Sequence, residues 1–99
     1  MDRVTEFSEK TVTEIASLLQ MPVVDLERES LRVYLHSRLA QVESALSALR
    51  QRYGVRSGEE MERLYREGKL AEENSWEDFF RLDHLEDEHD SLRRALDTL

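Results

Sequence analysis

Two regularly spaced apolar stripes dominate the pattern of hydrophobic and polar positions along the chain. In the first, intervals of four and three residues alternate through Leu35, Leu39, Val42, Leu46, Leu49 and Tyr53. In the second, the same intervals run through Leu82, Leu85, His89, Leu92, Leu96 and Leu99. This spacing places a narrow apolar seam along one side of a helix, as in coiled-coil packing. The sequence therefore predicts two helices that each need another helix to pack against, which favours binding over catalysis.

Capping residues set the predicted bounds of the first two helices. Ser8 is a suitable N-cap for a helix that ends near Gln20, because Pro22 disfavours helical backbone at the residue before it. Pro22 is also suited to begin the next helix, which continues to Tyr53 and is followed by Gly54 as a C-cap glycine. That helix has roughly 30 residues and would be about 45 Å long. Such a length requires another element or a second subunit to cover part of it.

Two further helices complete a predicted all-α fold. The capping box at residues 57–60 starts a short helix that stops at Gly68, and the last helix runs from about Trp76 to Leu99. The simplest arrangement is an antiparallel hairpin of the long and last helices, with the short helix at its closed end. The pattern leaves open whether the seams face each other or a second subunit, and the surplus apolar face favours a homodimer. The candidate packing and dimerisation residues are Leu31, Leu35, Leu39, Val42, Leu46 and Leu49.

Composition narrows the classes of function. The 99 residues make at most one domain, and 39% of them are apolar while 36% are charged. The net charge is −8, of which residues 41–99 carry −6, and this argues against nonspecific nucleic-acid binding and favours a basic partner. The chain has no Cys for a disulfide or a thiolate metal site, and no apolar run approaches the ~20 residues of a membrane span. We expect a soluble, cytoplasmic protein.

Residues 18–39 resemble the second half of the ribbon-helix-helix fold. Asp25-Leu26-Glu27-Arg28-Glu29-Ser30-Leu31-Arg32-Val33-Tyr34-Leu35, followed by Arg38-Leu39, is similar to the family pattern EL-x-REAL-x-x-YL-x-x-RL. The resemblance implies that residues 1–40 form a dimerisation part, with a short strand at residues 2–7 that in this family reads DNA. Asp2, Val4 and Glu6 would be its outward residues, and DNA phosphates would repel the two carboxylates. The strand has therefore lost DNA contact or does not form.

The remainder of the chain resembles the tail of small antitoxins of type II toxin–antitoxin pairs. Four motifs carry the likeness: Arg52-Tyr53-Gly54, Glu59-Glu60-Met61-Glu62, Arg66-Glu67-Gly68-Lys69-Leu70 and Trp76-Glu77-Asp78-Phe79-Phe80. The resemblance implies that residues 41–99 form an acidic, partner-binding helical hairpin on a dimerising base. It also implies a basic, nuclease-type toxin as the partner.

An acidic aromatic segment supplies the candidate partner-binding residues, namely Trp76, Phe79, Phe80, Glu73, Glu77 and Asp78. Trp76 and Phe80 share a helix face, because they are four residues apart. Aromatic side chains concentrate binding energy at interfaces, and surrounding acids speed the encounter with a basic partner. The alternative is that the rings close the hairpin against Met61, Leu64 and Tyr65. Both interpretations hold if only one ring stays exposed.

No motif points to catalysis or to a cofactor. Glu86 and His89 have the spacing of di-iron bundle ligands, but such a site needs two of these motifs and only one occurs, so no metal is predicted. The chain has no glycine-rich phosphate loop and no Cys nucleophile. Arg28, Arg32 and Arg38 form the only stretch with a basic bias, and the acids between them favour ion pairs within the helix over nucleic-acid contacts.

Three functions follow in order of preference. The first is an antitoxin-like protein that dimerises through its N-terminal helices and neutralises a basic nuclease-type toxin by blocking its active site or RNA path. The second is a structural helical adaptor or self-assembling coiled-coil protein. The third, a DNA-binding repressor, requires the N-terminal strand.

Overall fold

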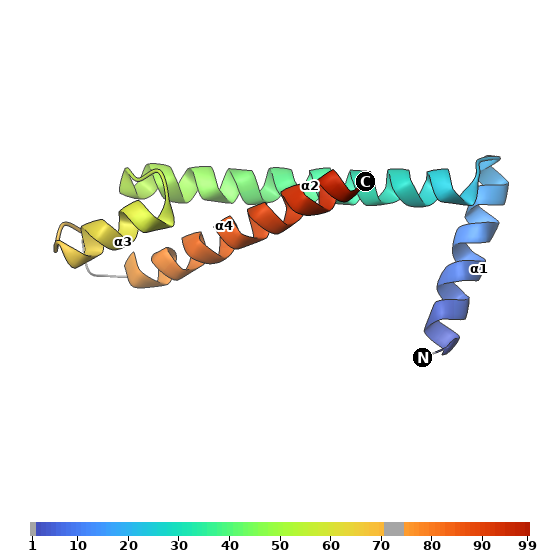
Figure 1. The fold of residues 1–99 in the computed structure, drawn as a ribbon, viewed down its shortest axis with the longest axis horizontal. Helices are drawn as coiled ribbons and strands as arrows, with labels where there is room; N and C mark the ends of the chain where they lie inside the picture. Colours follow the sequence, from blue (N-terminus) through green and yellow to red (C-terminus); the bar gives the residue numbers. More distant parts are fainter. Residues whose placement is uncertain (1, 71–74) are drawn as a thin grey trace.

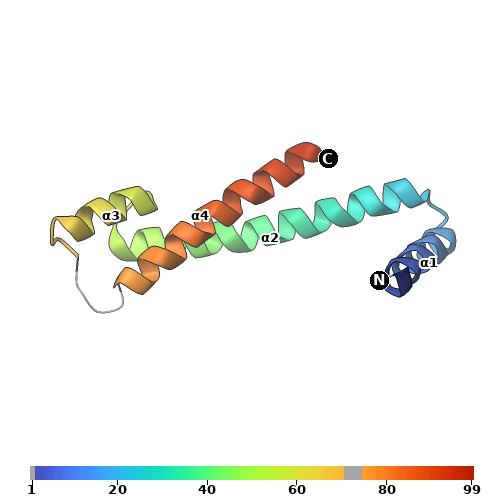
Figure 2. The ribbon, with the colours of Figure 1, turned by 60° about the horizontal axis from the view of Figure 1, so that its bottom comes forward.

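Four helices make up the part of the fold that the structure describes. The computed structural model describes the backbone of residues 2–70 and 75–99 and the side chains of residues 9–70 and 75–99. The helices are α1 (Asp2–Leu19), α2 (Val23–Tyr53), α3 (Gly58–Arg66) and α4 (Ser75–Thr98). Figures 1 and 2 show α4 running antiparallel to α2, α3 beside the first half of α4, and α1 turning away at the far end of α2. The described residues contain no strand, so the all-α prediction is confirmed.

The molecule is a rod rather than a globule. It measures 60 × 26 × 19 Å and its Cα radius of gyration is 19.7 Å. A compact chain of this length would have a radius of gyration of about 13 Å. The difference arises because α2 has 31 residues, and a helix of that length spans about 46 Å.

The core is the seam between α2 and α4, extended by α3. The predicted apolar stripes face each other within one chain, and the buried cluster consists of Leu39, Val42, Leu46, Leu49, Val55, Met61, Leu82, Leu85 and Leu92. Leu35 and Leu96 are partly buried at the open end of the hairpin. Leu31 lies beyond that end and is 52% exposed. Four of the six candidate packing residues are therefore buried in the hairpin, and Leu31 is left on the surface.

Three helices end in the same type of hydrogen-bonded turn. The backbone is left-handed at Gln20 (φ 55°), Gly54 (φ 66°) and Gly68 (φ 69°). The next residue in each case donates its N–H to a carbonyl five residues earlier, at 3.0, 3.0 and 2.9 Å. This is the Schellman arrangement, which satisfies carbonyls at the end of a helix. The two glycines mark the ends of α2 and α3 as predicted, whereas Gln20 adopts this backbone without being a glycine.

The possible N-terminal strand does not form, and the prediction of an N-cap at Ser8 is wrong. Residues 2–7 belong to α1 and are not a strand, and Ser8 lies within that helix rather than at its N-cap. A strand needs a neighbouring strand to satisfy its backbone groups, whereas a helix satisfies its own. Arg3 and Thr5 occupy the positions that a strand would turn inward, so the segment lacks the alternating apolar face of a strand.

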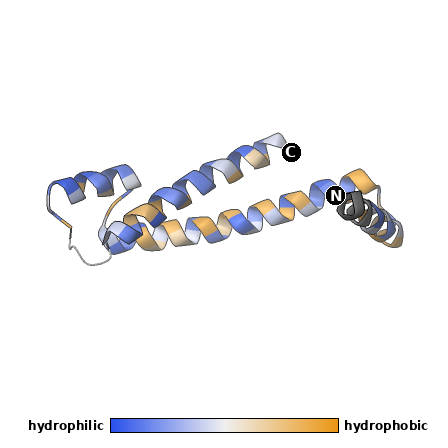
Figure 3. Cartoon of the chain, turned by 90° about the horizontal axis from the view of Figure 1, so that it is seen from below, coloured by the Kyte–Doolittle hydropathy of each residue, from blue (hydrophilic) through white to orange (hydrophobic). Residues whose placement is uncertain are grey.

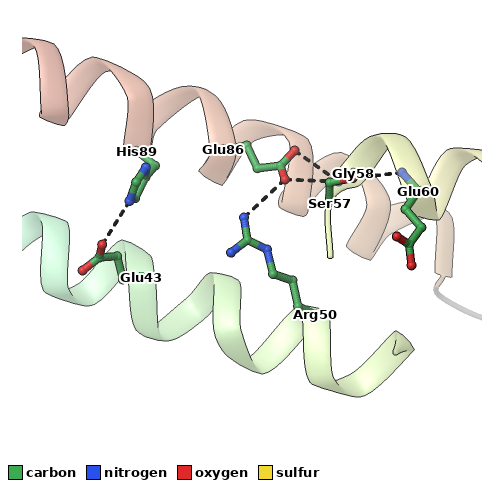
Figure 4. Close-up of polar contacts among 7 residues, drawn as sticks. All are labelled: Glu43, Arg50, Ser57, Gly58, Glu60, Glu86 and His89. Carbon is green, nitrogen blue, oxygen red and sulfur yellow. Dashed lines mark hydrogen bonds and ion pairs between the residues drawn. The ribbon is translucent and has the colours of Figure 1, made fainter. Parts of the chain in front are cut away.

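Glu86 fastens α3 to the hairpin (Figure 4). Its two carboxylate oxygens accept hydrogen bonds from the Gly58 N–H at 3.1 and 3.2 Å, and it pairs with Arg50 of α2 at 3.4 Å. Gly58 is the first residue of α3, so the carboxylate lies at the positive end of the helix dipole. The Ser57 hydroxyl accepts from the Glu60 N–H at 3.1 Å, as the capping box predicts. The short helix thus begins beside the middle of α4 and runs toward the closed end.

Candidate partner-binding surface

The first two turns of α4 divide the aromatic segment between the core and the surface. Phe79 packs against the core, while Trp76 and Phe80 are 52% and 58% exposed. The Trp76 and Phe80 rings meet edge to face with centroids 5.8 Å apart, and the Phe80 centroid lies 5.4 Å from that of Phe79. Edge-to-face contacts of this kind are favourable for aromatic pairs. One ring therefore closes the hairpin and two remain available to a partner.

A hollow lies between these rings and α3. Its volume is about 270 Å³, and it is lined by Glu62, Tyr65, Arg66, Trp76, Phe79 and Phe80. Met61 is completely buried one turn before Tyr65 and holds this face of α3 against the core. Pockets for small molecules usually measure about 300–1,000 Å³. The aromatic hollow is therefore better suited to one or two protein side chains than to a cofactor.

Three acids lie in the lining of the aromatic hollow or close to it in the chain: Glu62 in the lining, Glu77 next to Trp76, and Asp83 three residues after Phe80. Within the part of the chain that the structure describes, Glu62, Glu77 and Asp83 form no ion pair. α4 as a whole contains eight acids and three bases. Glu73, another candidate residue, lies outside the described residues. The field over the hollow is thus negative, with Arg66 as the basic group in its lining.

Asp78, also a candidate partner-binding residue, is engaged within the hairpin. Its side chain is 17% exposed, accepts a hydrogen bond from the Tyr53 hydroxyl and pairs with Arg52 at 3.3 Å. Burial and, next, the hydrogen bond to Asp78 raise the pKa of Tyr53. These contacts join the last turn of α2 to the first turn of α4. Asp78 therefore positions the aromatic segment and has little surface to offer a partner.

A second polar contact joins α2 to the middle of α4. Arg38 donates to both carboxylate oxygens of Glu88, at 2.5 and 2.8 Å. These hydrogen bonds lower the pKa of Glu88 and raise that of Arg38. The prediction of an ion pair within the helix is wrong for Arg38, while Arg32 does lie 4.0 Å from Glu29. The Arg38–Glu88 contact depends on which residues of the two seams lie opposite each other. The sequence alone does not specify this register, so the contact was missed.

The two residues with metal-ligand spacing serve different contacts. Glu86 docks α3, and the His89 ring hydrogen-bonds Glu43 of α2 at 3.1 Å (Figure 4). Among the described residues, no group of three or more His, Cys, Asp or Glu side chains is placed to hold a metal ion. None of the described helices combines the length and apolar character needed to cross a bilayer.

Comparisons with known proteins give the chain a family. No curated protein sequence and no solved structure matches it significantly. The model of the family described as the uncharacterized protein MJ0235 family matches residues 1–99. Because this match extends over all four helices and the aromatic hollow, the chain belongs to the MJ0235 family.

Proposed function

We propose that this chain is a protein–protein interaction module that binds a basic partner through the aromatic hollow. The observation that supports this most directly is the exposure of Trp76 and Phe80 beside Glu62, Glu77 and Asp83, which have no described ion-pair partner. Exposed aromatic side chains that a partner buries supply much of the energy of protein interfaces. Free acids around them speed association with a positively charged surface. The proposed role is binding and not catalysis.

A more specific form of the proposal names the partner. The four motifs that resemble antitoxins support a basic, nuclease-type toxin, held in the cytoplasm by an antitoxin-like homodimer that blocks the toxin's active site or RNA path. DNA binding is not part of the proposal, because residues 2–7 are helical and the reading strand of a ribbon-helix-helix protein is absent from them.

A structural adaptor is the second candidate function. The 60 Å rod and the exposed apolar side chains at the α1 end support it, because both are typical of helices that bridge other proteins. An adaptor of this kind would not need a basic partner at the aromatic hollow. The test of the first proposal therefore separates the two.

The test compares two variants in binding to one basic protein. The probe is the product of a small basic gene next to the gene for this chain, or the most basic protein that the wild type retains from native lysate. The double variant Trp76→Ala, Phe80→Ala should bind the probe at least about 100-fold more weakly, since each ring is expected to contribute a tenfold effect or more. Val33→Ala shortens an exposed apolar side chain on α2, away from the aromatic hollow, and is the control, which should bind as the wild type does.

Circular dichroism completes the test. The double variant should keep the helical signal of the wild type, because both rings are largely exposed. Equal binding by the double variant and the control would refute the proposed site. Loss of helical signal in the double variant would show that the rings belong to the core, and the proposal would fail for that reason.

A further inference from the structure

The elbow between α1 and α2 exposes most of the large hydrophobic side chains on the described surface. Eight of the twelve exposed ones lie there: Ile15, Leu18, Leu19, Val23, Val24, Leu31, Val33 and Tyr34. The inner angle of the elbow holds a hollow of about 450 Å³ lined by Val12, Ile15, Leu26, Glu27, Ser30 and Leu31. In Figure 3, hydrophobic residues recur along α2 beyond the end of α4. Apolar side chains grouped around a hollow in this way mark an interaction site.

The exposed face of α2 continues the seam that packs against α4. Val24, Leu31 and Leu35 are spaced seven and four residues apart and share one side of the helix. Leu35 packs against the core, while Val24 and Leu31 are more than half exposed. Between α1 and the last turn of α4, residues 23–34 of α2 span about 18 Å, and a helix with its side chains is about 10–12 Å wide. The uncovered face of α2 therefore has room for one more helix (Figure 1).

We propose that a second copy of this chain covers the elbow, with α1 of each copy lying on the uncovered face of the other's α2. This gives a geometry to the homodimer of the proposed function, and it does not depend on the aromatic hollow. α1 suits the role because its exposed side carries Ile15 and Leu18, the latter 77% exposed. A reciprocal arrangement uses the same surface twice, as twofold dimers do.

The distribution of charge favours a second copy over other occupants. Residues 9–34 contain five acids and three bases interspersed along both helices, so two copies meet there without a concentrated like charge. α4, in contrast, contains eight acids and three bases and would repel its own copy. A strongly basic protein is attracted to α4 rather than to the elbow. An anionic lipid surface is recognised by clustered basic groups, which the elbow lacks because its three bases are interspersed with five acids.

The exposed area is also sufficient for a dimer. The chain exposes 7754 Å², whereas a folded monomer of its mass would expose about 5,900 Å². The excess is about 1,900 Å², and a stable interface buries about 800 Å² on each partner. Dimerisation at the elbow can therefore bury the area of a stable interface and still leave surface for a partner at the aromatic hollow.

The mass in solution tests this geometry. Light scattering and sedimentation at tens of micromolar should give twice the 11.7 kDa of the chain. Leu31→Glu and Leu18→Glu should each raise the dimer dissociation constant at least 100-fold and give monomers. Val33→Glu is the matched control, because Val33 is exposed on the opposite side of α2 from Leu31, and this variant should stay dimeric.

Several outcomes would overturn the inference. They are a monomeric wild type at 100 µM, equal dimerisation of Leu31→Glu and Val33→Glu, or sedimentation of the monomer with phosphatidylserine vesicles. If Leu31→Glu loses helical signal, Leu18→Glu decides alone. The Trp76→Ala, Phe80→Ala variant should remain dimeric, and a monomer there would place the interface at the aromatic hollow. If the wild type and the Trp76→Ala, Phe80→Ala variant are both dimers but neither binds a basic protein, only the proposed function is refuted.

Discussion

The contact between Tyr53 and Asp78 makes the closed end of the hairpin sensitive to alkaline pH. Burial and the hydrogen bond raise the pKa of Tyr53 in the folded protein above the ordinary value of about 10. The folded state therefore binds this proton more tightly than the unfolded state. The contribution of Tyr53 to stability is complete below about pH 10 and is lost as the pH rises through the folded pKa.

Thermal melts between pH 7 and 11 should show this loss. Tyr53→Phe should lower stability by about 1 kcal/mol at neutral pH, because one hydrogen bond is removed, and should flatten the decline above pH 10. Tyr34→Phe, on the exposed surface of α2, should keep the wild-type profile. An unchanged alkaline decline in Tyr53→Phe would contradict this role for Tyr53.

Glu88 gives the middle of the hairpin the opposite dependence on pH. Hydrogen bonds from Arg38 lower the pKa of Glu88 in the folded protein. Its contribution to stability is present above the ordinary glutamate pKa of about 4.3 and is lost as the pH falls through the folded value. In urea unfolding between pH 3 and 7, Glu88→Gln should lower the midpoint at pH 7 and reduce the loss at acid pH. Asp83→Asn, an exposed change on the same helix, should behave as the wild type. If both variants lower the unfolding midpoint at pH 7 equally, the result would argue against a stabilising role for the Arg38–Glu88 contact.

At the scale of the element, α3 depends on one carboxylate from α4. Glu86 accepts from the first N–H of α3 and reaches Arg50 on α2, so it joins three helices. Glu86→Gln keeps the shape but removes the charge, and we expect a loss of about 1–2 kcal/mol in unfolding free energy measured with urea. Asp87→Asn changes the charge by the same amount at the adjacent, exposed position and should have little effect. Equal losses in the two variants would mean that general charge, and not the docking of α3, sets the stability.

Helices and their ends were predictable from the sequence where the signal is local. Gly54 and Ser57 act within their own turns, so their neighbours in the chain determine what they do. Ser8 is the counter-example, since a good cap residue contributes only about 1 kcal/mol, and α1 instead extends six residues further to Asp2.

The candidate site was predictable only in part. The spacing of Trp76 and Phe80 predicted a shared aromatic face, and those two rings are exposed. The opposite wall of the hollow comes from Tyr65 on α3, which was predicted only as part of the alternative in which the rings close the hairpin. Its place depends on the docking of Gly58 against Glu86, 28 residues away, and the sequence does not specify such a distant contact. The Arg38–Glu88 contact spans 50 residues and was missed for the same reason.

At the scale of the whole molecule, the rod separates two kinds of surface. The α3–α4 end is acidic and carries the aromatic hollow, while the elbow at the α1 end is apolar with mixed charge. α2 alone links them, over about 46 Å. A dimer formed at the elbow would therefore leave both aromatic hollows exposed, and each could hold its own basic partner.

The extended shape of a single chain is open to direct measurement. Leu31 is exposed and lies outside the buried cluster, so Leu31→Glu should give a monomer with the hairpin intact. Small-angle X-ray scattering from this variant should give a radius of gyration near the 19.7 Å of the structure, whereas a compact chain would give about 13 Å. A value clearly below 19.7 Å would mean that α1 folds back over α2 and covers the elbow within one chain. The apolar elbow would then be covered without a second copy. Small-angle scattering therefore tests both the extended shape of the chain and the exposed surface on which the proposed dimer depends.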